Sequence, residues 1–361
     1  DMDYPVAPVI RQAIAATVER NDLGYTGEAT EQALGKVFAE RMERRYGWQP
    51  DPSLVRPTGN LIQALIASVA SFSDPGSGIV IQTPIYYPFL KIVAALGRQL
   101  VDNRLLVGPQ RYEMDIPGLQ AAIDDDTRMV LFCNPHNPSG RVFERGALEQ
   151  LAALAVERDL IVVSDEIHAD LAYPGQQHIP LASLGPEIAA RTITLTSATK
   201  AFSIAGLKCA VMHFGSQELL RKQTGFFNEH LLGTSNVLGI EATLAAWRDG
   251  DEWLETVITQ LASNRRRLGE FIEQRLGPGK YRPPEAGYLA WLDCGALNLT
   301  PSPHEFFLQQ AGVALSDGGV FSSYTPEFAR LNFATSPEVL ELILQRIAEA
   351  LDNRQGRQSS P

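Results

Sequence analysis

The sequence has little cysteine and no long apolar segment, and these two features argue against several classes of protein. Its three cysteines, Cys133, Cys209 and Cys294, lie far apart and show no metal-ligand spacing. They indicate structural thiols in a reducing compartment, so we predict a cytoplasmic protein with no bound metal. No apolar run approaches the roughly 18 residues of a membrane span, and, without a charged-then-apolar leading segment, we expect no secretory leader. The chain starts at Asp1 without methionine, so we expect residues upstream of it.

Positive charge is also scarce relative to negative charge. The sequence has 31 basic and 42 acidic residues, which gives a net charge of −11. This balance disfavours nonspecific attraction to phosphate backbones or anionic lipid, so we predict neither nucleic acid nor a membrane as a partner. Apolar residues are plentiful, because 45% of the 361 residues are hydrophobic. That content can bury a substantial core and indicates about two domains.

Short apolar runs that are rich in β-branched residues alternate with longer, helix-like segments. The predicted strands are Gly78 to Gln82, Met129 to Cys133, Leu160 to Ser164 and Thr192 to Thr196. The helical or connecting stretches are Tyr86 to Leu96, Arg145 to Arg158 and Leu181 to Ala190. This alternation is typical of a mostly parallel sheet with crossovers on its faces, so the predicted fold class is α/β.

A second, smaller α+β unit is predicted towards the end of the chain. A long helical pattern, Val257 to Leu276, is followed by a break at Gly277 to Gly279, two strand-like runs and a closing amphipathic helix. The two runs are Tyr288 to Asp293 and Ala329 to Ala334, and the helix is Pro337 to Leu351. We therefore expect a large domain at 27–260, an N-terminal arm and small domain at 1–26 and 261–352, and a flexible tail at 353–361.

Polar residues that follow three of the predicted strands suggest where the chemistry lies. Ligands of open parallel sheets bind at the carboxyl ends of the strands. The turn at 134–140 presents Asn137, and the next strand end carries Asp165 and His168. Lys200 lies just after the last predicted strand of the large sheet, Thr192 to Thr196. An amide, a carboxylate and an amine are therefore expected at one edge of the sheet.

This set of groups suits pyridoxal 5'-phosphate. The Lys200 amine can form a Schiff base with the cofactor aldehyde and exchange it for a substrate amine. A buried carboxylate at Asp165 would keep the pyridine nitrogen protonated, which makes the ring an electron sink. Asn137 could donate to the ring oxygen beside the aldehyde, and His168 could contact the same edge.

The remaining parts of the cofactor need an anion-binding site and an aromatic cover. Thr58, Gly59 and Asn60 directly precede an apolar helix pattern, so this helix start is predicted to bind the phosphate. Ser197 can add a hydroxyl and Lys208 a second positive charge. Tyr86 follows a strand end, and we predict that its ring stacks on the cofactor.

At this point the chain resembles a known family over nearly its whole length: the fold-type I pyridoxal phosphate enzymes of the class I and II aminotransferase superfamily. Within it the sequence is most similar to the cystathionine β-lyase subgroup exemplified by the MalY and PatB proteins. The motifs that carry the resemblance are Asp1 to Pro8, Gly24 to Thr26, Thr83 to Tyr86, Asn134 to Gly140, Ser164 to His168, Ser197 to Lys200, Tyr288 to Asp293 and Arg330 to Asn332.

The resemblance implies an aspartate aminotransferase-like fold and adds two site residues. By it, Arg330 holds the substrate α-carboxylate, and Tyr25 reaches the phosphate of the neighbouring subunit, which implies a homodimer with shared active sites. Two departures matter. His168 stands where many aminotransferases have a tyrosine, which favours the lyase subgroup. Lys208 stands where many members have a phosphate-binding arginine, and a lysine cannot make the bidentate contact of an arginine.

Three functions follow from this reading. The first is carbon-sulfur β-lysis of a small amino-acid substrate, L-cystathionine or a related cysteine S-conjugate, to a thiol, pyruvate and ammonia. The alternative is transamination, which would use every residue named above. A remote alternative is a metal-dependent hydrolase, because Asp165, Glu166, His168 and Asp170 are all of ligand type.

Overall fold

A computed structural model describes residues 1–227 and 233–358 of the chain, and a seven-stranded sheet forms its centre. The strand order across the sheet is β1 (Val55–Thr58), β9 (Ala210–Phe214), β8 (Thr192–Thr196), β7 (Ile161–Asp165), β6 (Thr127–Cys133), β2 (Gly78–Thr83) and β3 (Gln99–Arg104). The pairs from β8 to β3 are parallel, whereas β9 is antiparallel to both of its neighbours. The predicted α/β class and mostly parallel sheet are confirmed.

Alternating side chains of the strands enter two different apolar layers. Ile79 and Ile81 pack with one set of helices, while Val80 between them packs with another, as a period of two residues requires. The first layer contains α3 (Leu61–Phe72), α4 (Pro88–Ala95) and α9 (Gln217–Phe226). The second contains α5 (Ile116–Ala122), α6 (Arg145–Glu157) and α7 (Pro186–Ala189). The sheet is therefore buried on both faces, as expected of parallel strands.

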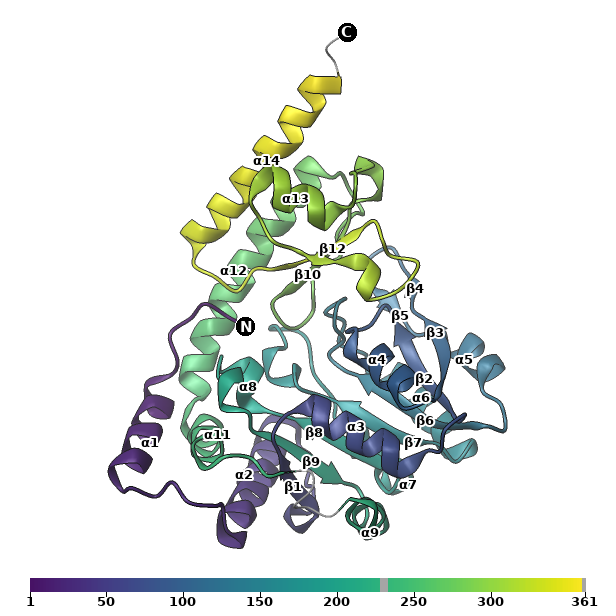
Figure 1. Ribbon diagram of the computed structural model, residues 1–361, viewed down its shortest axis with the longest axis vertical. Helices are drawn as coiled ribbons and strands as arrows, with labels where there is room; N and C mark the ends of the chain where they lie inside the picture. Colours follow the sequence, from purple (N-terminus) through teal and green to yellow (C-terminus); the bar gives the residue numbers. More distant parts are fainter. Residues whose placement is uncertain (228–232, 359–361) are drawn as a thin grey trace.

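A smaller unit stands beyond the carboxyl ends of these strands (Figure 1). Its antiparallel sheet has the order β10 (Leu289–Asp293), β12 (Phe328–Asn332) and β11 (Ser316–Asp317). The helices α13 (Pro303–Ala311), α14 (Pro337–Gln358) and α12 (Asp251–Arg275) accompany it. α12 runs from beside the large sheet to the small unit, so one continuous helix joins the two parts (Figure 1). The predicted small α+β unit is present.

Helices from two distant parts of the chain cover the β1 end of the large sheet. α2 (Glu28–Tyr46) and α11 (Val237–Asp249) share an apolar cluster with that end, and α1 (Pro8–Glu19) packs against α11. The remaining elements are short: β4 (Leu106–Val107), β5 (Tyr112–Glu113), α8 (Ala198–Ala201), η1 (Pro52–Leu54), η2 (Ala169–Leu171), η3 (Leu181–Leu184), η4 (Ala205–Leu207), η5 (Gly295–Leu297) and η6 (Gly318–Val320). Within residues 1–227 and 233–358, no helix is long and apolar enough to cross a membrane.

The closing helix is longer than expected: it was predicted to end at Leu351, but α14 continues to Gln358. The flexible tail at 353–361 stays a prediction. The last turns have partners in the small unit: Arg275 pairs with Asp352 at 2.8 Å, and Arg354 donates to the carbonyl of Asn298 at 3.0 Å. The rest of the predicted tail, 359–361, lies outside the described residues. The division at 260/261 falls inside α12, and it stays a prediction.

Candidate active site

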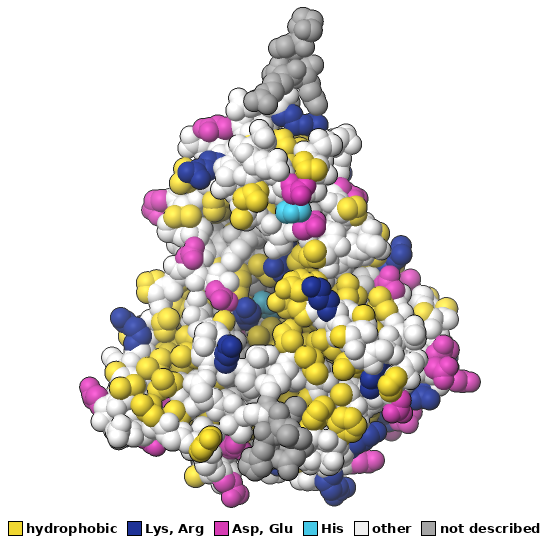
Figure 2. Space-filling view, viewed as in Figure 1, with side chains coloured by type: hydrophobic (Ala, Val, Ile, Leu, Met, Phe, Trp, Pro, Cys, Tyr) yellow, Lys and Arg dark blue, Asp and Glu magenta, His cyan; other side chains and the backbone are white. Residues whose placement is uncertain are grey.

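A cavity of about 580 Å³ lies between the carboxyl ends of the central strands and the small unit. Figure 2 shows it as a hollow with basic and histidine side chains inside and hydrophobic side chains around its rim. Ten of the predicted site residues line it: Gly59, Asn60, Tyr86, Asn137, Asp165, His168, Ser197, Lys200, Lys208 and Arg330. Thr58 and Tyr25 are not among the lining residues. The volume is in the range of small-molecule sites.

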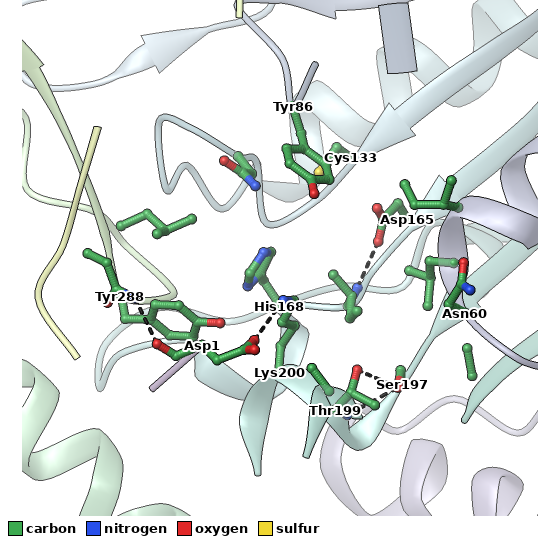
Figure 3. Close-up of a pocket in the computed structure, with 18 of the residues that line it drawn as sticks. Asp1, Asn60, Tyr86, Cys133, Asp165, His168, Ser197, Thr199, Lys200 and Tyr288 are labelled. Carbon is green, nitrogen blue, oxygen red and sulfur yellow. Dashed lines mark hydrogen bonds and ion pairs between the residues drawn. The ribbon is translucent and has the colours of Figure 1, made fainter. Parts of the chain in front are cut away.

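Asp165 ends β7 and points its carboxylate into the cavity (Figure 3). It is 6% exposed and accepts one hydrogen bond, from the backbone N–H of Ile167 at 3.1 Å. Among the described residues it forms no ion pair. Burial, and secondarily the neighbouring Glu166, raises the pKa of Asp165 to about 7. The site therefore holds a buried carboxylate that could be satisfied by a cationic ligand.

Lys200 lies on the short helix α8, which begins directly after β8. Ser197 caps this helix, its hydroxyl accepting a hydrogen bond from the N–H of Thr199 at 3.1 Å. Burial lowers the pKa of Lys200, and the nearby Arg330 lowers it further, while Asp165 opposes both. The ammonium lies 3.1 Å from a carboxylate oxygen of Asp1. An amine with a lowered pKa is neutral more often, and only the neutral form is nucleophilic or basic.

The start of α3 forms one end of the cavity, as predicted for an anion-binding site. Asn60 is the N-cap and accepts from the N–H of Gln63 at 2.9 Å. The N–H groups of Leu61 and Ile62, which also line the cavity, precede the first intrahelical bonds and have no helical acceptor. The exposed Lys208 borders the same cavity. Together these groups suit a phosphate.

Two of the residues predicted to contact the phosphate make other hydrogen bonds in this structure. Thr58 ends β1 and is buried; its hydroxyl donates to the Gln63 side chain at 3.2 Å and its carbonyl accepts from Ser235 at 2.7 Å. Thr58 therefore supports the helix start, and it is not among the residues that line the cavity. Ser197 lines the cavity, but its hydroxyl donates to the carbonyl of Cys209 at 2.5 Å. Thr199, whose hydroxyl is 2.8 Å from that of Ser197, is a second candidate hydroxyl that sequence reasoning did not assign.

Arg330 enters the cavity from β12 of the small unit. Its guanidinium donates to the side-chain oxygen of Asn137 at 2.8 Å and to the hydroxyl of Ser316 at 3.2 Å. No carboxylate pairs with it in the described part of the chain, and burial lowers its pKa. A partly buried guanidinium without an acidic partner is suited to an anionic ligand. Because Arg330 occupies the amide oxygen of Asn137, the NH₂ group of Asn137 is left to serve as a donor.

His168 and Tyr86 complete the walls of the cavity. Burial, followed by the positive charges of Lys200 and Arg330, lowers the pKa of His168 to about 3, so the ring is neutral. Its Nδ1 atom is buried without a hydrogen-bond partner, and the ring meets that of Tyr288 edge-on at 6.1 Å. Figure 3 places Tyr86 across the cavity from Lys200. This position agrees with a ring that covers one face of a bound group.

The cavity also includes residues that no sequence pattern indicated as ligand-facing. Tyr288 and Asn332 are brought to it by the small unit, and Asp1 by the N-terminal segment. Their only sequence signal was membership of motifs that carried the family resemblance. Tyr25, by contrast, is fully exposed and outside this cavity.

The structure separates the four residues of the metal hypothesis. Glu166 accepts from the Ser164 hydroxyl at 2.8 Å and contacts His178 Nε2 at 2.9 Å. Asp170 pairs with the buried guanidinium of Arg41 at 2.8 Å. Neither carboxylate lines the cavity, and no cluster of metal-ligand type is found among residues 1–227 and 233–358. The geometry therefore gives no support to a metal-dependent hydrolase.

The fold and the cavity define an open α/β enzyme with its site at the carboxyl ends of the strands, facing a small second unit. Residues 1–347 match the family Aminotransferase class I and II, and the chain belongs to this family. The family resemblance expected from the motifs is thereby confirmed.

Individual relatives are similar to this chain over nearly its whole length. The chain is 34% identical to a cystathionine beta-lyase of Corynebacterium glutamicum, covering 97% of this chain and 92% of that protein. It is 32% identical to the cystathionine beta-lyase PatB of Bacillus subtilis, covering 97% and 91%. Among solved structures, the PLP-bound C-S lyase of Staphylococcus hominis superimposes with a TM-score of 0.90 at 31% identity, covering 97% and 91%. The expected fold is confirmed.

Proposed function

We propose that this chain is a pyridoxal phosphate-dependent carbon-sulfur β-lyase that cleaves L-cystathionine or a related cysteine S-conjugate. One observation carries the proposal: Lys200, with a lowered pKa, shares a cavity with the buried and unpaired carboxylate of Asp165. The names of the curated relatives, cystathionine beta-lyases, support the choice of reaction.

The residues present fit the cofactor. When bound, pyridoxal phosphate supplies an aldehyde that condenses with amines and a ring that withdraws electrons from the substrate Cα. Asp165 would hold the proton of the ring nitrogen, and that contact would give the buried carboxylate its missing partner. Asn137 and His168 would face the ring oxygen, and Tyr86 would cover the ring.

The phosphate would lie at the start of α3. The free N–H groups of the first turn offer backbone donors, and Lys208 adds a positive charge. Gly59 and Asn60 line the cavity beside them, although the Gly59 N–H donates to the Gln63 side chain at 3.2 Å. Ser197 would donate to the phosphate only if its hydroxyl turned away from the carbonyl of Cys209. The hydroxyl of Thr199, 2.8 Å away, is an alternative donor.

The substrate would be oriented by its α-carboxylate and would react at its Cα. Arg330 would bind the carboxylate through the guanidinium N–H groups that face the cavity. Lys200, in its neutral form, would take the Cα proton onto Nζ, and the thiolate would then leave from Cβ. The neutral His168 adds no positive charge close to this proton transfer. Hydrolysis of the remaining three-carbon fragment yields pyruvate and ammonia.

We further propose a cytoplasmic homodimer with shared active sites. Tyr25 is fully exposed on its own chain, which is consistent with a contact to the cavity of a second copy. All three cysteines are buried free thiols, as suits a reducing compartment.

The test offers L-cystathionine to the purified, cofactor-loaded enzyme without any 2-oxo acid and measures pyruvate and ammonia. We expect both products in equal amounts, and none with Lys200→Ala. Consumption of L-cystathionine that strictly requires a 2-oxo acid, with the amino group passed to that acid and no ammonia released, would instead identify the enzyme as an aminotransferase.

A further inference from the structure

The first three residues of the described chain form a fixed bridge between the small unit and the lysine-bearing segment. Asn332 of β12 donates its side-chain NH₂ to the carbonyl of Asp1 at 2.8 Å. The Ser203 hydroxyl, three residues after Lys200, donates to the carbonyl of Met2 at 2.8 Å. Asp3 donates its N–H to the carbonyl of Ala334 at 2.8 Å, and the side chain of Met2 is buried. The backbone at this point is therefore held from both sides.

This bridge places the Asp1 carboxylate against the reactive amine. Its Oδ1 lies 3.1 Å from Lys200 Nζ, as the dashed line in Figure 3 shows. The other charged or titratable groups that face the lysine are Asp165 of β7, His168, Arg330 of β12, Lys208 and Tyr288. Among the described residues, Asp1 is the one carboxylate within ion-pair distance of Nζ.

We propose that Asp1 is a positioning residue for Lys200, whose carboxylate holds the lysine ammonium whenever Nζ is not bonded to a ligand. The role deepens the proposed function and rests on it for its place in catalysis. When Lys200 takes the substrate Cα proton, its neutral amine becomes an ammonium beside the positive charge of Arg330. The Asp1 carboxylate then provides the negative charge that the ammonium needs, without itself gaining or losing a proton.

The size of the effect follows from distance and exposure. A carboxylate this close to an amine raises its pKa by about 1–3 units. The Lys200 and Asp1 side chains are 33% and 58% exposed, and solvent screening therefore places the effect at the lower end. Loss of the Asp1 charge should lower the pKa of Lys200 by about one unit, a roughly tenfold change in the fraction of neutral amine.

The test measures the reactivity of Lys200 in the complete chain without cofactor. Trace labelling with acetic anhydride across a pH series, followed by peptide mass spectrometry, reports the titration midpoint of each amine, and Lys208 serves as an internal reference. We expect the Lys200 midpoint to fall by about one unit in Asp1→Asn. It should return towards the wild-type value in Asp1→Glu.

Asp3→Asn is the matched control. Asp3 lies two residues after Asp1, its side chain is exposed, and the substitution removes the same negative charge. It should leave the Lys200 midpoint unchanged, and circular dichroism should show all variants folded. An unchanged midpoint in Asp1→Asn, or an equal shift in Asp3→Asn, overturns the role of Asp1. This outcome is distinguishable from failure of the proposed function, because the labelling requires neither cofactor nor turnover.

Discussion

At the scale of single residues, burial sets the charge states that the site requires. Asp165 and Lys200 carry opposite charges, yet they form no ion pair with each other, and burial shifts the pKa of each towards the neutral form. In the ligand-free protein these two groups are destabilising. The same features prepare them to bind a cationic ring and to exchange protons, so part of the stability is given up for function.

Asp165→Asn tests this trade-off through pH. The folded-state pKa of about 7 lies above the unfolded value of about 3.9, so the folded protein binds the extra proton between them. The contribution of Asp165 to the stability of the ligand-free protein is therefore fully present below pH ~4. It is lost as the pH rises to ~7. Asp165→Asn removes this loss. The change that it causes in the free energy of unfolding should therefore be more stabilising at pH 8 than at pH 4, by up to about 4 kcal/mol.

Denaturant titrations at pH 4 and pH 8 measure this difference. Asp126→Asn, on an exposed turn, is the control and should show no such dependence. The same Asp165→Asn variant should bind pyridoxal phosphate more weakly. An equal effect on stability at both pH values would contradict a pKa of Asp165 that burial raises.

Sequence reasoning found the residues whose positions depend on strand ends and missed those that depend on packing. Lys200, Asp165 and Asn137 follow apolar runs, so their convergence could be predicted from the parallel sheet alone. Asp1 and Tyr288 reach the cavity only because distant segments pack together, which no local pattern encodes. Thr58 is not among the residues that line the cavity, and its contact with the phosphate stays a prediction.

At the scale of elements, the buried central strands were predicted and the peripheral ones were not. β1 has four residues that include Pro57, which an edge strand tolerates because its outer N–H groups need no partner. β3, at the opposite edge, is largely exposed and polar, so it lacks an apolar run. β9 is fully buried, but it follows β8 with only short helices between them and runs antiparallel. An alternation of strands and long helices does not predict such a return.

The helix ends illustrate the same limit. α14 extends beyond its predicted end, where it contacts residues that are distant in sequence. One such contact is the ion pair between Asp352 and Arg275. α12 crosses the predicted domain boundary without a break. A rigid helix shared by the two units would keep Arg330, which belongs to the small unit, at a defined distance from Lys200.

At the scale of the whole molecule, the chain is acidic, but in the cavity three basic side chains face two carboxylates, those of Asp1 and Asp165. The net charge is −11, yet Lys200, Lys208 and Arg330 face the cavity together. Local positive potential inside a low-dielectric cleft attracts anionic ligands, whereas the acidic exterior repels them elsewhere. A phosphorylated cofactor and an amino-acid carboxylate both match this distribution.

The proposed sharing of active sites between subunits can be tested by complementation. Tyr25→Ala should lower activity by about 10-fold or more, since a hydrogen bond to a charged group contributes about 1.5–3 kcal/mol. Co-expression of Tyr25→Ala and Lys200→Ala chains should then restore about a quarter of wild-type activity, because half of the dimers are mixed and each has one complete site. A control pairs Tyr25→Ala chains with chains that carry both substitutions; its dimers contain no Tyr25 and should show only the residual activity of Tyr25→Ala. Failure of the first mixture to exceed this control would contradict shared sites.

The central claim is that Lys200 is the residue that bonds to pyridoxal phosphate, and borohydride reduction of the loaded enzyme tests it most directly. Reduction fixes the cofactor to the amine that holds it, and mass spectrometry of the digested protein locates the added mass. The account predicts a single pyridoxyl group on the peptide that contains Lys200, and none anywhere in Lys200→Ala. A pyridoxyl group on another lysine, or no added mass in an active enzyme that is inactivated by a chelator, would contradict it.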